Sequence, residues 1–390
     1  MHRTGAYSFI RNNEDIKAPV DYEMPPNNAI ASLVSGLRSA HAAYEPSKRD
    51  NSSIPGILFV VQPRNMNICD ERPLEYGLWD SNPSIPAYRV IFGAEVIANT
   101  HLSPGGELLF ESPSLPVPVE IAVVYMRAGY DAEEYTSAGC RARVLLESSR
   151  AIKCPSILGH LATFKKVQQA LAVPGVLAKF LSPEDAATIA KTFVPTYPMD
   201  VDSEAGRQGR ALALNLKTAR NHVLKPSLEG GGHNIYGTDI PGFLRTLPRS
   251  KWHTYILMKL INPVVQKGIL LTLSGIYHGA VAEGTHGFHE EPQSDPSNPS
   301  GNLVTRLGGP IVNELGIFGV CLWRRRKRRL WPRSGPPDLM INSEAGWSLK
   351  TKPANVNEMS VVKGYGCFDS PCLVGSEQEE SSIAPPQDIT

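Results

Sequence analysis

Several features that would assign a chain to a special class of protein are missing from this sequence. The longest apolar stretches, such as Gly56–Val61 and Gly316–Trp323, are far shorter than the roughly 18 residues that a membrane-spanning helix needs, so we expect no membrane span. Residues 1–10 lack a charged segment followed by an apolar core, which argues against a secretory signal and favours a cytoplasmic protein. The six cysteines form no CxxC pair, so we expect free thiols.

A strong charge of either sign is missing too. Lys and Arg number 39 against 38 Asp and Glu, and a formal net charge of +1 argues against a general attraction to nucleic acid or membranes. The 390 residues, 42% of them hydrophobic, indicate a globular protein with two or three domains. Glycine and proline, at 33 residues each, predict many loops and argue against an all-helical bundle.

In the first half of the chain, short apolar runs are separated by helix-sized segments. This pattern predicts a parallel sheet with crossovers, and we assign residues 56 to about 150 to one α/β domain. Residues 1–55 are polar and irregular apart from a predicted helix over 28–44. The apolar runs are Gly56–Val61, Tyr88–Phe92 and Ile121–Tyr125, and a helix is predicted over 71–80.

In the second half of the chain, a predicted helical stretch is followed by short strand-like runs. Residues 157–194 are predicted to be helical, with Ser182 as a cap and Pro195 closing the last helix. Residues 283–302 and 375–390 have the composition of a mobile loop and a disordered acidic tail. Strand-like runs that favour a mixed or antiparallel sheet are His222–Lys225, Tyr255–Met258 and Leu315–Leu322.

The segment Lys225–Gly237 carries the clearest chemistry. A strand ends at Lys225, three glycines (Gly230, Gly231 and Gly232) follow, and Ile235–Tyr236 resumes a strand. Backbone amides of side-chainless residues can cradle phosphate oxygens, and Glu229 is an oxygen ligand of the kind that Mg²⁺ takes. The alternative is a glycine-rich hairpin loop without a ligand, but the lysine, glutamate and asparagine around the glycines favour a nucleotide.

This block resembles the glycine-rich ATP loop of eukaryotic glutathione synthetase, an ATP-grasp ligase. The resemblance covers about residues 57–374 and rests on several motifs in the same order. The further motifs are Asn67–Arg72, Val124–Tyr130, Ala142–Pro155, Thr163–Gln169, Tyr255–Met258, Glu314–Gly319, Leu349–Lys352 and Val361–Val362.

The resemblance implies an α/β fold of ATP-grasp architecture. It comprises a substrate-binding, parallel-sheet domain over 56–155 and a mixed or antiparallel ATP-binding domain over 156–374, which follow an incomplete N-terminal segment over 1–55. It also implies a homodimeric ligase that joins γ-glutamylcysteine to glycine through an acyl phosphate, with ATP as co-substrate and Mg²⁺ as cofactor. In that reaction the glycine loop and the segment near Val361 are expected to close over the reactants.

The resemblance also implies roles for individual residues. The ATP contacts would be Lys165, Lys225, Glu229, Gly230, Gly231, Gly232, Asn234, Tyr236, Met258 to Ile261, Glu314, Lys352 and Glu358, with Glu229 as the metal ligand. The dipeptide contacts would be Asn67, Glu71, Arg127, Ala128, Gly129, Tyr130, Lys350, Val361 and Val362. The catalytic residues would be Arg3, Gly230, Gly231 and Lys350.

The chain departs from the family pattern at a few positions. Arg3 only faintly matches the family's arginine segment, no Glu-x-Asn-Thr pair follows it, and we expect part of the N-terminal region to be missing. Lys350 stands in place of an arginine, Glu71 in place of a glutamine and Ala128 in place of an acidic residue. A catalytically silent nucleotide-binding remnant that pairs with an intact subunit is therefore the alternative function.

Other signals have simpler interpretations. The basic run Arg324–Arg329 between two tryptophans could bind RNA, but we expect a solvated hairpin turn and no nucleic-acid partner. His278, His286 and His289 match no zinc spacing. Cys69 and Cys140 have no histidine partner in sequence, so we expect neither to be a nucleophile.

Overall fold

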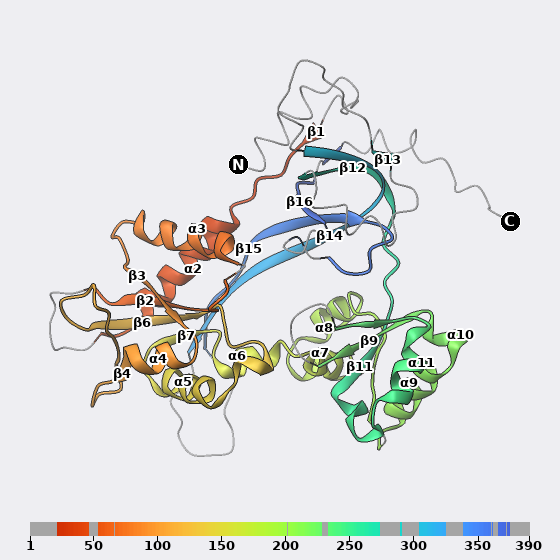
Figure 1. The fold of residues 1–390 in the computed structure, drawn as a ribbon, viewed down its shortest axis with the longest axis horizontal. Helices are drawn as coiled ribbons and strands as arrows, with labels where there is room; N and C mark the ends of the chain where they lie inside the picture. Colours follow the sequence, from red (N-terminus) through yellow and green to blue (C-terminus); the bar gives the residue numbers. More distant parts are fainter. Residues whose placement is uncertain are drawn as a thin grey trace. The chain divides into compact units, whose positions relative to one another are not determined.

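The computed structural model describes residues 22–46, 54–65, 67–200, 202–227, 233–273, 289–290, 304–324, 338–359, 361, 366–371 and 373–374. The chain divides into two compact units, one formed by Met1–Leu33 with Pro263–Thr390 and the other by Val34–Asn262. Figure 1 shows their elements. The predicted domains 56–155 and 156–374 stay predictions, because this division does not test them.

A mainly parallel sheet opens the unit Val34–Asn262. β2 lies between β3 and β6 and runs parallel to both, as the apolar runs predict, and β7 runs parallel to β6. All six residues of β2 are buried, which explains its unbroken apolar sequence. The parallel strands are β2 (Gly56–Val61), β3 (Ala87–Ile91), β6 (Val119–Met126) and β7 (Ile152–Cys154). An antiparallel hairpin that pairs with β6 consists of β4 (Thr100–Leu102) and β5 (Leu108–Phe110).

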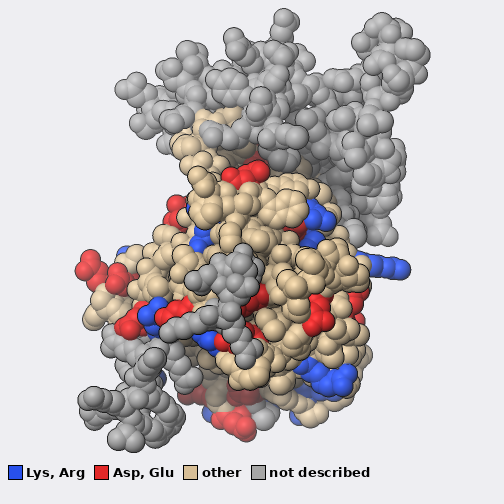
Figure 2. Space-filling model, turned by 90° about the vertical axis from the view of Figure 1, so that its left-hand side faces the viewer, with Lys and Arg blue, Asp and Glu red and all other residues tan. Residues whose placement is uncertain are grey.

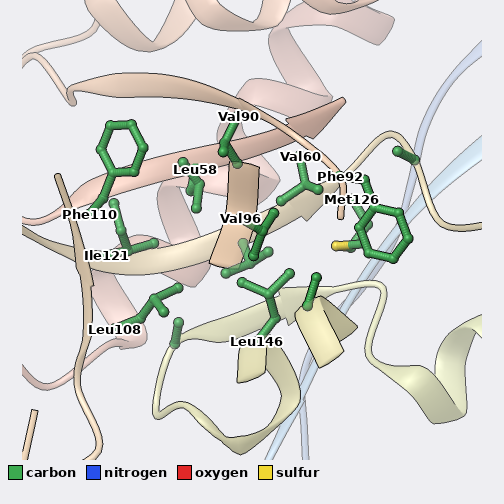
Figure 3. Packing of buried hydrophobic residues seen from close by; sticks show 14 residues of the cluster. Leu58, Val60, Val90, Phe92, Val96, Leu108, Phe110, Ile121, Met126 and Leu146 are labelled. Atoms are coloured by element: carbon green, nitrogen blue, oxygen red, sulfur yellow. The ribbon is translucent and has the colours of Figure 1, made fainter. Parts of the chain in front are cut away.

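Helices cover both faces of this sheet. α2 (Ala29–Ala43) and α3 (Ile68–Trp79) lie on one face, and α4 (Ala94–Asn99) and α5 (Ser137–Ser148) lie on the other (Figure 1). Under α4 and α5, the side chains of Val96 and Leu146 pack with Leu58 and Val60 in one buried cluster (Figure 3). The short helix η1 (Ala132–Glu134) precedes α5.

A second, antiparallel sheet follows in the same unit, with the strand order β10-β9-β11-β8. Its core joins Leu224 and Leu257 of the sheet to Ile240 and Leu244 of α11, so the helices after β8 cover one of its faces. The strands are β8 (Thr196–Pro198), β9 (His222–Pro226), β10 (Ile235–Tyr236) and β11 (Tyr255–Lys259). The helices after β8 are α9 (Glu204–Leu214), α10 (Leu216–Ala219), α11 (Asp239–Thr246) and η3 (Arg249–Thr254). The helices between the two sheets are α6 (Ile157–Ala162), α7 (Lys165–Leu171), η2 (Leu177–Lys179) and α8 (Pro183–Ala190).

The other unit is built around a long antiparallel hairpin of β14 (Val304–Arg324) and β15 (Asp338–Pro353). The first residue of α2 lies against β15 at Gly346, where a Cβ would lie 2.7 Å from Ala29 Cα. The remaining strands are β12 (Gln266–Leu273) and β13 (His289–Glu290), which pair with β14, β16 (Cys367–Asp369), which pairs with β15, and β1 (Tyr22–Glu23), which pairs with β17 (Leu373–Val374).

Most of the predicted elements are confirmed, with shifted ends. The helix predicted over 71–80 begins earlier, at Ile68. The helical prediction over 157–194 is confirmed by α6, α7 and α8, and Ser182 caps α8 as predicted. Turns separate these helices, and α8 ends at Ala190, before Pro195. One break falls where Gly175 has a φ of 79°, a left-handed conformation that ends helices.

The structure describes little of the predicted loop over 283–302 and none of the predicted tail over 375–390. Within 283–302, His289–Glu290 forms a strand and not a loop, because both residues pair with β14. The rest of that stretch and residues 375–390 lie outside the described residues. β14 ends at Arg324, which pairs with Asp338, so the basic run does connect two antiparallel strands as predicted.

Charges of both signs are mixed on the surface. On the face drawn in Figure 2, Lys and Arg side chains alternate with Asp and Glu, and neither forms a broad field. This distribution agrees with a formal net charge of +1. Among the described residues, no helix has both the length and the apolar character that crossing a membrane requires.

Candidate active site

Residues predicted to hold a dipeptide lie at one edge of the parallel sheet. Asn67 stands between β2 and α3, and Arg127–Tyr130 follow β6. From β2 the chain goes first to β3 on one side and later to β6 on the other, so the two loops leave the carboxyl ends of neighbouring parallel strands. A reversal of strand order of this kind opens a crevice at the carboxyl edge, where open α/β sheets bind their ligands.

Asn67, Arg127 and Tyr130 come together at this edge. Burial raises the pKa of the Tyr130 phenol, and the carboxylates of Glu134 and Asp131 raise it further. Arg127 and a hydrogen bond with the Asn67 side chain act in the opposite direction. A neutral phenol therefore lies near a guanidinium, and such a pair can hold a carboxylate by one neutral and one charge-assisted hydrogen bond.

The turn that carries these residues is fixed by Gly129. Its φ of 77° lies in the left-handed region that favours glycine, and a Cβ there would lie 3.2 Å from Phe92 Cζ. The Gly129 carbonyl accepts a hydrogen bond from Tyr135 Oη at 2.6 Å, and Ala128 is buried. A cavity of about 270 Å³ lies beside the turn, lined by Met126, Ala128, Gly129, Tyr130, Arg143, Pro155, His160 and Thr163.

Glu71, predicted as a substrate contact, lies beneath Arg127. Its side chain is 1% exposed, and its Oε1 is 3.5 Å from Arg127 Nε. Its Oε2 accepts a hydrogen bond from Asn65 Nδ2 at 2.6 Å and contacts Arg89. Sequence reasoning missed Arg89; the available signal was a lone arginine among apolar residues in the short strand 87–91.

Residues predicted to contact ATP share one face of the antiparallel sheet. Paired residues of antiparallel strands point to the same face, and Lys225 pairs with Ile256, while Val223 pairs with both Tyr236 and Met258. Lys225, Tyr236 and Met258 therefore lie on the face opposite Leu224 and Leu257, which pack against α11. Asn234 Nδ2 donates a hydrogen bond to Tyr236 Oη at 3.4 Å.

Two further predicted ATP contacts border this sheet. Lys165 is the first residue of α7, a helix that packs against β8 and β11. The predicted segment Met258 to Ile261 begins in β11 and runs beyond it, and Ile261 is 63% exposed. The Leu260 amide donates to the Asn221 carbonyl at 2.9 Å, so this segment is held by backbone bonds after the strand ends.

A third group of predicted residues lies on the β14–β15 hairpin. Glu314 pairs with Lys350 and Val312 pairs with Lys352, which places Glu314, Lys350 and Lys352 on one face. Lys350 Nζ is 3.4 Å from Glu314 Oε1. Burial lowers the pKa of Lys352, while Glu314 counteracts this shift. Two ammonium groups beside a carboxylate can hold phosphate and hydroxyl groups of one ligand.

Of the remaining predicted site residues, the structure describes only Glu358 and Val361. Glu358 and Val361 follow β15 and are partly buried. Arg3, Glu229, Gly230, Gly231, Gly232 and Val362 lie outside the described residues. The flanks of the glycine loop are nevertheless described, and β9 and β10 pair antiparallel as the predicted strand-loop-strand requires.

Comparisons with known proteins show which family the chain resembles over almost its whole length. Residues 1–373 match the family described as eukaryotic glutathione synthase, ATP binding domain. The glutathione synthetase large chain of Schizosaccharomyces pombe is 31% identical over 354 residues, which are 88% of this chain and 62% of that protein. The chloroplastic glutathione synthetase of Solanum lycopersicum is 32% identical over 379 residues, which are 96% of this chain and 57% of that protein.

A solved structure is similar as well. A glutathione synthetase-like effector from Globodera pallida matches with a TM-score of 0.56 at 18% identity, over 90% of this chain and 62% of that chain. This likeness concerns the fold. The chain spans roughly three fifths of the length of these relatives, as their covered shares of 62% and 57% show. Because the family match covers almost all of its residues, the chain belongs to the eukaryotic glutathione synthase family.

Proposed function

We propose that this chain is an ATP-dependent ligase that joins γ-glutamylcysteine to glycine and forms glutathione, ADP and phosphate. The observation that carries the proposal is the convergence of Asn67, Arg127 and Tyr130 at the carboxyl edge of the parallel sheet. A family name alone would not locate a substrate, whereas a guanidinium and a phenol at this edge suit a carboxylate.

The proposed reaction has two steps. The cysteinyl carboxylate attacks the γ-phosphorus of ATP, ADP leaves, and an acyl phosphate forms. The glycine amine then attacks the acyl carbon, loses a proton and expels phosphate, which leaves the new amide. Arg127 would hold a dipeptide carboxylate, while Lys165, Lys225, Lys350 and Lys352 would neutralise phosphate charge, so positioning and electrostatics supply most of the catalysis.

Mg²⁺ is part of this proposal through the nucleotide. The ion usually takes one or two protein carboxylates and completes its shell with phosphate oxygens and water. Glu229 is the carboxylate that the sequence offers, and within the described residues no cluster of three or more potential ligands competes with it. When bound, the ion would neutralise negative charge that develops on the phosphates.

A cytoplasmic location and a homodimer complete the proposal. The five described cysteines that are free support a reducing compartment. The homodimer rests on the family resemblance alone.

The test is ADP release by the purified chain with ATP, Mg²⁺, γ-glutamylcysteine and glycine. We expect release that requires both amino substrates, and a loss of at least about tenfold in Arg127→Met, because one charge-assisted bidentate contact is removed. Arg141→Met is the matched control, since Arg141 is exposed on α5 away from this loop. Nucleotide binding without dipeptide-dependent release would instead establish the silent remnant.

A further inference from the structure

Charged side chains gather between α3 and the parallel sheet, directly beneath the predicted dipeptide site. Glu71 and Glu75 are four residues apart on α3, so they share one face of the helix, and both side chains are almost fully buried. Arg89 of β3 lies between them, with one terminal nitrogen on Glu71 and the other on Glu75. Two more residues complete the cluster: Asn65 donates a hydrogen bond to Glu71, and Arg72 donates one to Glu75.

Arg127 approaches the same cluster from the neighbouring strand. Phe59 of β2 pairs with Arg89 on one side and with Tyr125 on the other, so these three side chains point to the α3 face. Arg127 follows two residues after Tyr125, and its amide donates to the Val60 carbonyl at 2.7 Å. The register of the sheet thus brings two arginines to one glutamate.

Arg127 faces Glu71 with the Nε edge of its guanidinium. Arg127 Nε is 3.5 Å from Glu71 Oε1, and neither atom has a hydrogen bond within the part of the chain that the structure describes, although both are buried. The Arg127 side chain as a whole is 30% exposed. Its inner edge therefore faces the buried carboxylate, while part of the side chain remains accessible to a ligand.

Stability alone does not account for this arrangement. Taking charges out of water costs free energy that buried ion pairs seldom recover relative to apolar packing. The strand beneath the cluster, β2, is entirely buried and apolar, so the layer could have been filled with apolar side chains. A role in orienting a group at the site accounts for the charges better.

We propose that Glu71 and Arg89 are positioning residues for Arg127. Arg89 fixes the Glu71 carboxylate, and Glu71 in turn orients the Nε edge of Arg127. Because the guanidinium is planar, fixing one edge sets the plane in which the terminal nitrogens meet a carboxylate. Glu71 then acts through Arg127 and not on the substrate, unlike the substrate contact that the sequence predicted. This inference rests on the proposed function, because it takes the dipeptide as the ligand of Arg127.

The main test compares the double variant Glu71→Gln/Arg89→Gln with the wild-type chain by calorimetric titration of γ-glutamylcysteine and, separately, ATP. Removing both charges avoids leaving either of them alone, and Glu75 keeps Arg72 at 2.5 Å. We expect the dissociation constant for the dipeptide to rise about tenfold, the effect of having to order one long side chain on binding. The dissociation constant for ATP should not change.

Arg72→Gln is the matched control, because it removes a guanidinium from the same cluster that contacts Glu75 and not Glu71. It should bind both ligands like the wild-type chain. Arg89→Lys keeps the charge but loses the planar fork that gives each carboxylate its own terminal nitrogen, so its dipeptide affinity should lie between those of the wild type and the double variant. A double variant with wild-type dipeptide affinity, or with equal losses for dipeptide and ATP, would overturn the inference.

A second readout separates this inference from the proposed function. The Nε–Hε signal of Arg127 in a ¹⁵N spectrum, assigned by its loss in Arg127→Lys, should exchange slowly with solvent in the wild type and rapidly in the double variant. If the wild-type chain binds no γ-glutamylcysteine, the proposed function fails. The exchange rate of the Arg127 Nε–Hε signal then decides by itself whether Glu71 and Arg89 position Arg127. Equal exchange rates in the two proteins would refute the positioning role, and a faster rate in the double variant would uphold it.

Discussion

Among single residues, Lys352 of the proposed nucleotide site has a pKa that its surroundings shift. Its ammonium donates a hydrogen bond to the Val356 carbonyl, and burial lowers its pKa while Glu314 partly restores it. The protonated amine attracts phosphate, and it loses that proton at a lower pH than an ordinary lysine, whose pKa is about 10.4. The proposed phosphate contact is therefore sensitive to alkaline pH.

We predict that ATP affinity falls as pH rises through this lowered pKa, and that Lys352→Arg abolishes the fall because arginine stays charged. The measurement is the calorimetric dissociation constant of ATP across the alkaline range. Lys217→Arg, at an exposed lysine on α10, should keep the wild-type profile. Parallel profiles for the wild type and Lys352→Arg would show that Lys352 does not contact the phosphates.

Gly129 illustrates the cost of adding one methyl group at the dipeptide edge. Its φ of 77° and the 3.2 Å approach of Phe92 Cζ to an added Cβ both oppose Gly129→Ala. We expect a loss of about 1–3 kcal/mol in the free energy of unfolding. Gly242→Ala is the matched control in α11, where a Cβ would meet nothing within 4 Å, and alanine should add about 1 kcal/mol through helix propensity. Denaturant titration of both variants checks the expected loss of stability in Gly129→Ala and the expected gain in Gly242→Ala.

Sequence reasoning reached these residues unevenly. Asn67, Arg127 and Tyr130 were identified by resemblance to a family motif, and the structure brings them together. Glu71 was assigned by the same resemblance, but its burial depends on the packing of α3 against Arg89 and Arg127 of the sheet, which no local pattern reveals. Arg89 escaped notice for the same reason, since its partners are 14 and 18 residues away along the chain.

Among the secondary-structure elements, α5 shows how a local signal positions part of the site. Thr136 caps the helix by accepting a hydrogen bond from the Gly139 amide at 3.2 Å, and Ala142 and Leu146 of α5 enter the buried cluster. Arg143 of the same helix lines the cavity beside Gly129 and Tyr130. The cap therefore fixes an element that shapes the predicted dipeptide edge.

We predict that Thr136→Ala lowers the free energy of unfolding by about 1 kcal/mol, because the capping hydroxyl is lost. Thr136→Ser should retain wild-type stability, since serine caps at least as well. The check is the midpoint of chemical denaturation at constant slope. Equal destabilisation by both substitutions would assign the effect to packing of the threonine methyl group instead of the cap.

The elements themselves were predictable where hydrophobic pattern decides them. Apolar runs identified β2, β3 and β6, because buried parallel strands are apolar on both faces. The hairpin of β4 and β5 was missed, since three residues per strand are too few to show alternation. Helices within 157–194 and the Ser182 cap were predictable, but the breaks between them were not, because tertiary packing and the turn at Gly175 set where each helix ends.

At the scale of the whole molecule, the parallel and antiparallel sheets confirm the predicted α/β fold class, and the family match confirms the resemblance to eukaryotic glutathione synthetase. Predicted ligand-binding residues occur in both compact units: the dipeptide edge and one nucleotide face in Val34–Asn262, and Glu314, Lys350 and Lys352 in the other. A ligand that binds the folded chain and not the unfolded one should stabilise it by mass action.

The most direct test of the account follows oxygen atoms through the reaction. γ-Glutamylcysteine labelled with ¹⁸O in its cysteinyl carboxylate is incubated with the purified chain, ATP, Mg²⁺ and glycine, and the products are analysed by mass spectrometry. If the carboxylate attacks the γ-phosphorus, glutathione forms and each inorganic phosphate carries one ¹⁸O from the dipeptide. Absence of glutathione, or unlabelled phosphate accompanying its formation, would contradict the account.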